Sequence, residues 1–184
     1  MRFVMTVVLL CTLFVLTSCK KKGGGESYKL ETTSVTLDMA PYTVTGQVPR
    51  WKKNESMPGY PMFLLTEDGV GMAHIQFSTR MCMECAKGGI DKEIDKYFTS
   101  RLEMEGGHVG VKVVAPKKLR DGVWTMTIKR KDDVTKDEPL EVTVFHYIKG
   151  MPQMLQCTAW SRGKRIALSK KLQALCENVK VSKK

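Results

Sequence analysis

The sequence lacks the short motifs by which several classes of enzyme are recognised. It contains no Gly-x-Ser-x-Gly nucleophile motif, and its glycine run, Gly23–Gly25, precedes no strand–helix unit that could cradle a phosphate. No pair of carboxylates stands apart from the solvated charges, and the chain has no internal repeat. The sequence therefore favours a protein that is not an enzyme and that needs no cofactor.

Acidic residues are scarce relative to basic ones. The chain has 19 Asp and Glu against 30 Lys and Arg, which gives a formal net charge of +11. Such an excess favours anionic partners, among them lipid headgroups, polymers of the cell envelope and nucleic acids. The cationic residues are spread along the whole chain and are not interleaved with aromatic residues, so a solvated basic surface is the simplest interpretation.

Apolar runs long enough to span a bilayer comfortably are also missing. The run Phe3–Leu16 carries no charge but is too short for this, and it follows a positively charged N-terminus. It leads into Leu16–Cys19 (LTSC), where two small residues directly precede a cysteine. These four residues resemble the lipobox of bacterial lipoproteins. The alternative is an uncleaved membrane helix with an incidental cysteine.

The lipobox resemblance implies an anchor. Residues 1–18 would be a signal peptide, and the thiol of Cys19 would receive diacylglycerol, with further acylation (palmitate, for example) at the new N-terminus. Two or more acyl chains hold a protein stably on a membrane. Residues 19–27 would form a tether, in which Lys20, Lys21 and Lys22 lie at the headgroups, where each cation adds about 1 kcal/mol of attraction. The glycine-rich spacer that follows them is flexible.

The residue after Cys19 also bears on location. Lys20, in place of Asp, resembles the sorting pattern of outer-membrane lipoproteins, so we expect the periplasmic leaflet of the outer membrane if the organism has two membranes. A protein placed outside the cytoplasm is not expected to meet nucleic acid.

Residues 28–184 have a suitable length for one globular domain that needs no metal to fold. Helical spacing of apolar residues predicts a helix from Ile90 to the stop at Gly106–Gly107, and a final helix over Lys164–Val179. Alternating or β-branched segments predict strands at 28–39, 42–45, 62–65, 70–78, 109–115, 123–129, 141–148 and 153–160. The strands at 62–65 and 70–78 are predicted to form a hairpin with its turn at Glu67–Gly69. This order predicts an α+β fold, an antiparallel β-sheet flanked by two main helices.

A family resemblance supports the same expectation. The segment Tyr42–Trp51 (YTVTGQVPRW) resembles the opening of PsbP-like and DcrB-like domains, in which an alternating strand is followed by Pro and then Trp. The predicted order of elements over Tyr28–Ser182 is also similar to that family. The resemblance implies an accessory or assembly protein, and it transfers no catalytic residues to this chain.

Cys11 would leave with the leader, and Cys19 would be acylated. Four other cysteines remain: Cys82, Cys85, Cys157 and Cys176. Outside the cytoplasm an even number permits two disulfides, in any of three connectivities. Cys157 shares a predicted strand face with apolar residues, and Cys176 lies on the apolar stripe of the last helix. These two could form a structural pair in the core or pack as free apolar thiols.

The CxxC motif at Cys82 and Cys85 follows a predicted strand and precedes a helix, as in thioredoxin-like oxidoreductases. The loop Gly150–Gln153 resembles the proline loop that faces the cysteines in such enzymes. Against this interpretation, no Trp or Gly-Pro accompanies the motif, and Ala86–Gly89 separates it from the helix. Two interpretations therefore remain for this pair, a local structural disulfide and a pair with redox activity. The sequence favours the structural disulfide.

Metal binding has weak support. One CxxC together with His74, His108 or His146 does not give the regular ligand spacing of a zinc site, so no metal is expected. The methionines around the predicted hairpin have two interpretations, core filling and an adaptable apolar groove or soft-metal site. The sequence thus predicts a lipoprotein that binds a protein or an anionic envelope polymer, with an anchored thiol–disulfide oxidoreductase as the alternative.

Overall fold

The computed structural model describes residues 29–54, 59–65, 71–87, 89–105, 108, 110–130, 139–163 and 168–184. The predicted signal peptide, Cys19, Lys20–Lys22 and the spacer therefore lie outside the described residues, as does the predicted hairpin turn at Glu67–Gly69. Within the described ranges, no helix combines the length and the apolar character needed to cross a membrane.

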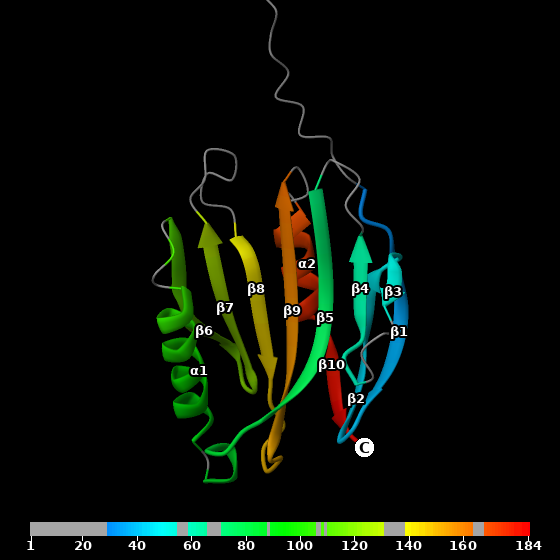
Figure 1. The fold of residues 1–184 in the computed structure, drawn as a ribbon. Coiled ribbons are helices and arrows are strands. Elements are labelled where there is room, and N and C mark those ends of the chain that lie inside the picture. The colour runs from blue at the N-terminus through cyan, green and yellow to red at the C-terminus, as the bar shows by residue number, and fades with distance from the viewer. Residues whose placement is uncertain are drawn as a thin grey trace, which may run out of the picture.

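The described residues are mostly strand, and they form ten strands, two α-helices and one short 3-10 helix (Figure 1). The strands are β1 (Thr32–Met39), β2 (Tyr42–Pro49), β3 (Lys52–Asn54), β4 (Met62–Leu65), β5 (Gly71–Met81), β6 (Val111–Arg120), β7 (Val123–Arg130), β8 (Pro139–His146), β9 (Gln153–Gly163) and β10 (Lys180–Lys183). The helices are η1 (Cys85–Lys87), α1 (Ile90–Glu105) and α2 (Ser169–Glu177).

The strands form two separate sheets. A seven-stranded sheet has the order β3-β4-β5-β9-β8-β7-β6, and a three-stranded sheet has the order β1-β2-β10. All the pairs are antiparallel. The longest pair joins β5 to β9 from Gly71↔Gly163 to Met81↔Gln153, so residues far apart in the sequence form the centre of the large sheet.

Helix α2 lies between the two sheets, where it closes the main hydrophobic core. Leu168 just before the helix, and Leu172 and Cys176 within it, are fully buried. They belong to one cluster with Val44 of β2 and Val144 of β8. Tyr42 links the sheets further, because its hydroxyl donates a hydrogen bond to the carbonyl oxygen of Gln153.

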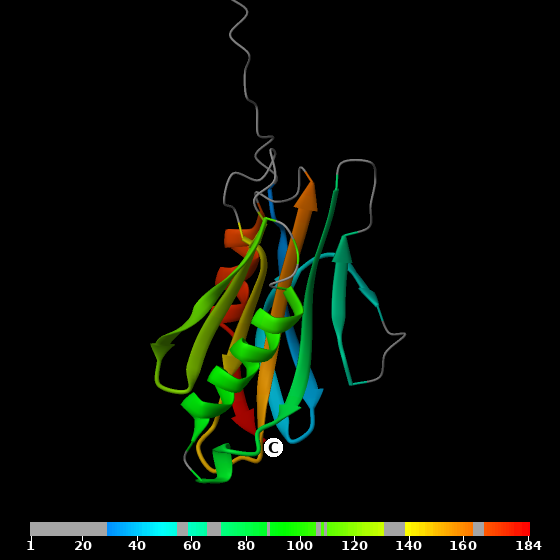
Figure 2. The ribbon, with the colours of Figure 1, turned by 60° about the vertical axis from the view of Figure 1, so that its left-hand side comes forward.

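Helix α1 packs on the opposite face of the large sheet, toward the β6 edge (Figure 2). Its buried residues Ile94 and Tyr97 contact Trp124, Met126 and Phe145 in a second, smaller cluster, whose other buried member is Met154. The ring of Tyr97 meets that of Phe145 edge to face, with the ring centroids 5.0 Å apart. Figure 1 shows that α1 covers only one side of this face, and that β5 and β4 carry no helix over them there.

The predicted fold class, an α+β sheet flanked by two main helices, is wrong. The protein is largely β, and its last helix does not flank a single sheet but is enclosed between two. The reason is that β10 returns to pair with β2, where Lys180 lies opposite Thr45, and so builds a second sheet with β1. The sequence order of strands does not reveal such a long-range pairing.

Individual elements were predicted with varying success. The helix from Ile90 is confirmed as Ile90–Glu105, and the hairpin of β4 with β5 is confirmed by pairs such as Phe63↔Ile75. The strand predicted at 42–45 is longer than expected, because β2 continues through the buried Val48 and ends at Pro49. The final helix is shorter than predicted and ends at Glu177.

Candidate functional site

A disulfide between Cys157 and Cys176 joins the large sheet to α2. The two residues are fully buried, and their Cα atoms are 5.5 Å apart. Beside them, Nε2 of the buried His146 lies 2.8 Å from the carbonyl oxygen of Cys176. Burial disfavours the charged imidazole and lowers the pKa of His146 to about 4. At neutral pH the ring is therefore uncharged, and its N–H donates to that carbonyl.

A second disulfide joins Cys82 to Cys85, in the loop between β5 and α1. The N–H of Cys82 donates to the carbonyl oxygen of Pro152 at 2.9 Å. The hydroxyl of Tyr147 donates to the carbonyl oxygen of Cys85 at 3.2 Å and accepts from the N–H of Gly150 at 3.0 Å. The two segments that resemble a thioredoxin site, the CxxC and the proline loop, therefore do lie against one another.

The sulfur atoms of this second disulfide are poorly accessible. Cys82 and Cys85 are each only 2% exposed. Thiol–disulfide exchange begins when an incoming thiolate attacks one sulfur, so access is a requirement for redox activity. The geometry of this buried disulfide is that of a structural crosslink, which holds the loop before α1 in place.

A cavity of about 550 Å³ lies beside Cys85. Trp124 lines it, and the indole N–H of Trp124 donates to Asp91 at 3.1 Å. Lys118 reaches over the same ring, 5.5 Å from its centroid, and pairs with Asp121 at 2.9 Å. Opposite charges thus face one another across the lining, which makes the cavity unsuited to a strong anion or a strong cation.

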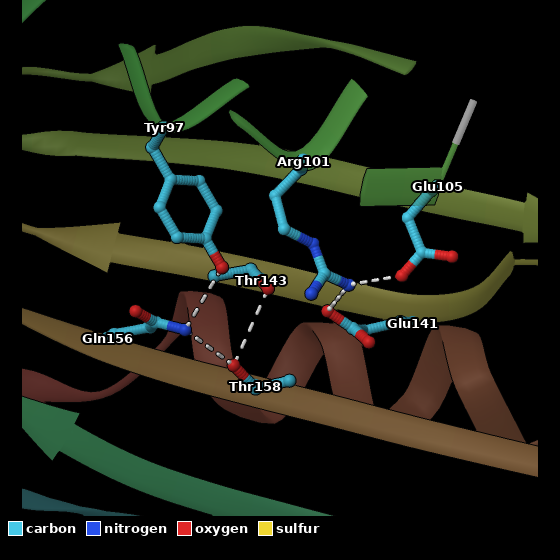
Figure 3. A network of polar contacts seen from close by, with 7 residues as sticks. All are labelled: Tyr97, Arg101, Glu105, Glu141, Thr143, Gln156 and Thr158. Carbon is cyan, nitrogen blue, oxygen red and sulfur yellow. Dashed lines mark hydrogen bonds and ion pairs between the residues drawn. The ribbon is translucent and has the colours of Figure 1, made fainter. Parts of the chain in front are cut away.

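The face of the large sheet that carries α1 also carries two polar groups of residues (Figure 3). In the first, Arg101 of α1 contacts Glu105 at 3.3 Å and Glu141 of β8 at 3.0 Å. Burial raises the pKa of Glu141, an effect that the positive charge of Arg101 opposes. This ion pair holds the C-terminal part of α1 to β8.

The second polar group continues across the sheet toward β9 (Figure 3). The amide of Gln156 donates to the hydroxyl of Tyr97 at 3.4 Å and to that of Thr158 at 3.1 Å. Thr158 lies 3.4 Å from the hydroxyl of Thr143 on β8. Burial raises the pKa of Tyr97, so this hydroxyl stays protonated at neutral pH. These side chains are engaged with one another and support α1 on the sheet.

An aromatic and cationic cluster lies further along the same face, on the strands β5 and β9. His74 stacks on Trp160 with the ring centroids 5.3 Å apart, and the guanidinium of Arg162 lies 5.4 Å from the centroid of the same indole. We call His74, Trp160 and Arg162 the Trp160 cluster. Burial lowers the pKa of His74, which favours its neutral, stacking form.

The structure separates the other residues that the sequence suggested as ligands. His74 lies in the Trp160 cluster, His108 is exposed, and His146 is in the core. Among the residues that the structure describes, no three His, Cys, Asp or Glu side chains come together in a way that could hold a metal ion. Met151 and Met154 are buried and fill the core as the sequence indicated, whereas Met81 and Met83, beside the CxxC, are 55% and 72% exposed.

Sequence reasoning missed the Trp160 cluster. The alternation of β5 does place His74 on the face opposite Ala73 and Ile75, and the alternation of β9 does place Trp160 opposite Cys157. What the sequence could not give was the register His74↔Trp160, which brings the two rings together. The ion pair of Arg101 with Glu141 was missed for the same reason.

No protein-family model matches this chain, and no curated protein matches it significantly. The lipobox and the PsbP-like resemblance are therefore not tested by these comparisons and stay predictions.

Proposed function

We propose that this chain is a membrane-anchored lipoprotein of the cell envelope that binds a partner near the membrane and is not an enzyme. The observation that supports a place outside the cytoplasm is that all four cysteines after Cys19 are used in two buried disulfides. Such bonds persist in oxidising compartments and are rare where cellular reductants act. This agrees with the export that the leader and Leu16–Cys19 predict.

The character of the described side chains supports binding over catalysis. A general acid or base must reach the proton that it transfers. Here Glu141 is committed to Arg101, and the neutral His146 is buried against Cys176. The chemistry that the surface does offer is cationic, so the proposed partner is anionic: a protein, an envelope polymer or the lipid surface itself.

Acylation is tested in cells that express the full chain with a clickable palmitate analogue. We expect label on the wild type and none on Cys19→Ala, which should also leave the detergent phase on phase separation. Cys11→Ala is the matched control, because it removes a cysteine of the leader that is not at the predicted cleavage site. Equal labelling of all three chains would contradict the anchor.

The disulfides are tested on the mature chain. We expect none of the four thiols to react with a maleimide until a reductant is added, and a non-reducing peptide map to show the pairs Cys82–Cys85 and Cys157–Cys176. Free thiols at Cys157 and Cys176 in protein from the cell envelope would remove the main support for an oxidising location.

A second candidate function is an anchored thiol–disulfide oxidoreductase. The observation that favours it is the contact between Cys82 and Pro152, with a cavity beside Cys85. Its test is insulin reduction by the wild type and by Cys82→Ser, with Cys157→Ser as the control for a lost disulfide elsewhere. Activity that disappears only in Cys82→Ser would establish the redox function, and equal inactivity would remove it.

A further inference from the structure

The described chain enters the domain at one defined end. β1 begins at Thr32, opposite Pro49, and the N–H of Arg50 donates to the carbonyl oxygen of Glu31 at 3.0 Å. Figures 1 and 2 both place the start of β1 at the same end as the start of β5, the end of β9 and the first turn of α2. We call this the entry end. The C-terminus lies at the opposite, far end (Figure 1).

The Trp160 cluster belongs to the entry end. β5 begins and β9 ends with the pair Gly71↔Gly163, and the pair His74↔Trp160 follows three residues further along. Lys52 of β3 joins the same level of the sheet, because it lies opposite Leu64, which in turn lies opposite His74. The indole and the guanidinium of the cluster are therefore near the place from which the chain leads back to Cys19.

Exposed cations gather at the same end of the domain. Besides Arg162 of the cluster they are Lys29, Arg50, Lys52, Lys170 and Lys171, the last two in the first turn of α2, on the other face of the large sheet. The described acids at this end are fewer: Glu31 and Glu103 are exposed, and Glu105 and Glu141 share the single cation Arg101. The entry end thus combines a net positive charge with a half-buried tryptophan.

We propose that the entry end is a membrane-docking surface that binds anionic lipid headgroups, to which the Trp160 cluster contributes from the side of β5 and β9. The inference rests on the proposed anchor at Cys19, because only nine residues (20–28) separate that cysteine from Lys29. A linker of this length spans at most about 35 Å even when fully extended. The end of the domain closest to the acyl chains is therefore the one that carries these cations.

The chemistry of the cluster fits a lipid surface better than a soluble partner. Tryptophan has an apolar body and a polar N–H, and such side chains favour the interface between headgroups and acyl chains. Lys and Arg beside it pair with phosphate oxygens, and their long stems can follow the apolar region while the charge stays in water. A second, electrostatic contact would also fix the orientation of a domain that is otherwise attached to the membrane only through Cys19.

The test uses the mature chain with Cys19→Ser and with Lys20–Lys22 replaced by serine, so that neither acyl chains nor the tether contribute. We expect sedimentation with vesicles of phosphatidylcholine that contain about one third phosphatidylglycerol, little with phosphatidylcholine alone, and loss of binding as NaCl rises to about 0.5 M. The triple variant Arg50→Glu, Lys52→Glu and Lys170→Glu should bind at least about tenfold more weakly.

The matched control reverses three exposed cations away from the entry end, with Lys87→Glu, Lys149→Glu and Lys183→Glu. It changes the net charge equally and should keep most of the binding. Equal loss in both triple variants would mean that only net charge matters and would overturn the proposal. Absence of vesicle binding, or binding to an anionic cell-wall polymer but not to vesicles, would overturn it too.

Orientation is tested by fluorescence with a quencher attached to the headgroups. The measurement is made in a Trp51→Phe background, because Trp51 lies between Arg50 and Lys52 at the same end. There Trp160→Phe should remove most of the quenchable emission, whereas Trp124→Phe should not, because Trp124 lies beside the cavity at the far end. Quenching that survives in Trp160→Phe would contradict the surface. If the vesicle and quenching tests fail while Cys19 is acylated, the docking surface is wrong and the proposed anchor stands. If the domain binds vesicles but Cys19 is not acylated, the anchor is wrong and the docking surface stands.

Discussion

The two helices are attached to the same sheet in different ways. The nine-residue α2 is enclosed between two sheets, has a fully buried stripe at Leu172 and Cys176, and is linked covalently to β9. The sixteen-residue α1 is longer, but it buries only Ile94, Tyr97 and Glu93 and depends on ion pairs and hydrogen bonds at its sheet-facing edge.

This difference teaches that length does not decide which helix is central to the fold. Helix stability in proteins comes mainly from the packing of an apolar face. The main core includes residues of both sheets and α2, whereas the cluster under α1 contains only six buried residues. We therefore expect α2 to be part of the last region to unfold, and α1 to open at lower cost.

The largest effect should come from truncating the two apolar anchors. Leu172→Ala removes a fully buried side chain from the main core, and we expect it to lower the free energy of unfolding by about 3–5 kcal/mol. Ile94→Ala, in the smaller cluster, should cost about 2–3 kcal/mol. Urea denaturation followed by circular dichroism measures both. A greater loss for Ile94→Ala would reverse the comparison between the helices.

The disulfide on the α2 side should also contribute more to stability than the one next to α1. Cys157 and Cys176 are 19 residues apart, and closing such a loop in the unfolded chain is worth about 3 kcal/mol, whereas the three-residue separation of Cys82 and Cys85 gives about 2 kcal/mol. We expect Cys157→Ala/Cys176→Ala to lower the unfolding midpoint more than Cys82→Ala/Cys85→Ala. Hydrogen exchange should place the second effect in the loop before α1, and protection lost across the whole sheet there would contradict this.

A third difference concerns pH, because a titratable group lies on each side of the sheet. The pKa of His146, on the α2 side, is lowered from 6.5 to about 4 in the folded protein. Its contribution to the free energy of unfolding is therefore fully present above pH 6.5 and is lost as the pH falls toward 4. The loss should reach roughly 3 kcal/mol. His146→Gln should flatten this dependence, and His108→Gln, at an exposed site, should not.

The sequence predicted the elements whose signal is local. Helix α1 was found because Ile90, Ile94 and Tyr97 recur at helical spacing, and the hairpin of β4 with β5 because two apolar arms flank a turn. Each of these patterns is contained within about twenty residues, so no knowledge of distant segments was needed. The CxxC likewise suggested a local disulfide without any information about the fold.

The features that decide the architecture depend on distant residues. Pairing of Lys180 with Thr45 creates the second sheet, and nothing in either segment specifies the other. Gly46 is one trace of this packing: a Cβ atom there would lie 2.9 Å from Cγ1 of Val179, so the approach of the chain to β2 requires glycine. Without knowledge of which strands pair and in what register, neither this contact nor the pair His74–Trp160 could be predicted from the sequence.

The smallest expected effect is on the α1 side, and its sign is opposite to that of His146. Burial holds the pKa of Glu141 above its ordinary value in spite of Arg101, so the folded protein binds this proton more tightly than the unfolded chain does. The stabilisation is therefore present at pH values below the ordinary pKa of Glu and is lost as the pH rises through the raised one.

Glu141→Gln should remove this dependence, best seen in a His146→Gln background, where the larger slope of opposite sign is gone. Glu105→Gln is the matched control, because it also contacts Arg101. If Glu141→Gln leaves the dependence of stability on pH between about 4 and about 7 unchanged, the ion pair with Arg101 outweighs burial, and α1 is held to β8 more firmly than its small apolar cluster indicates.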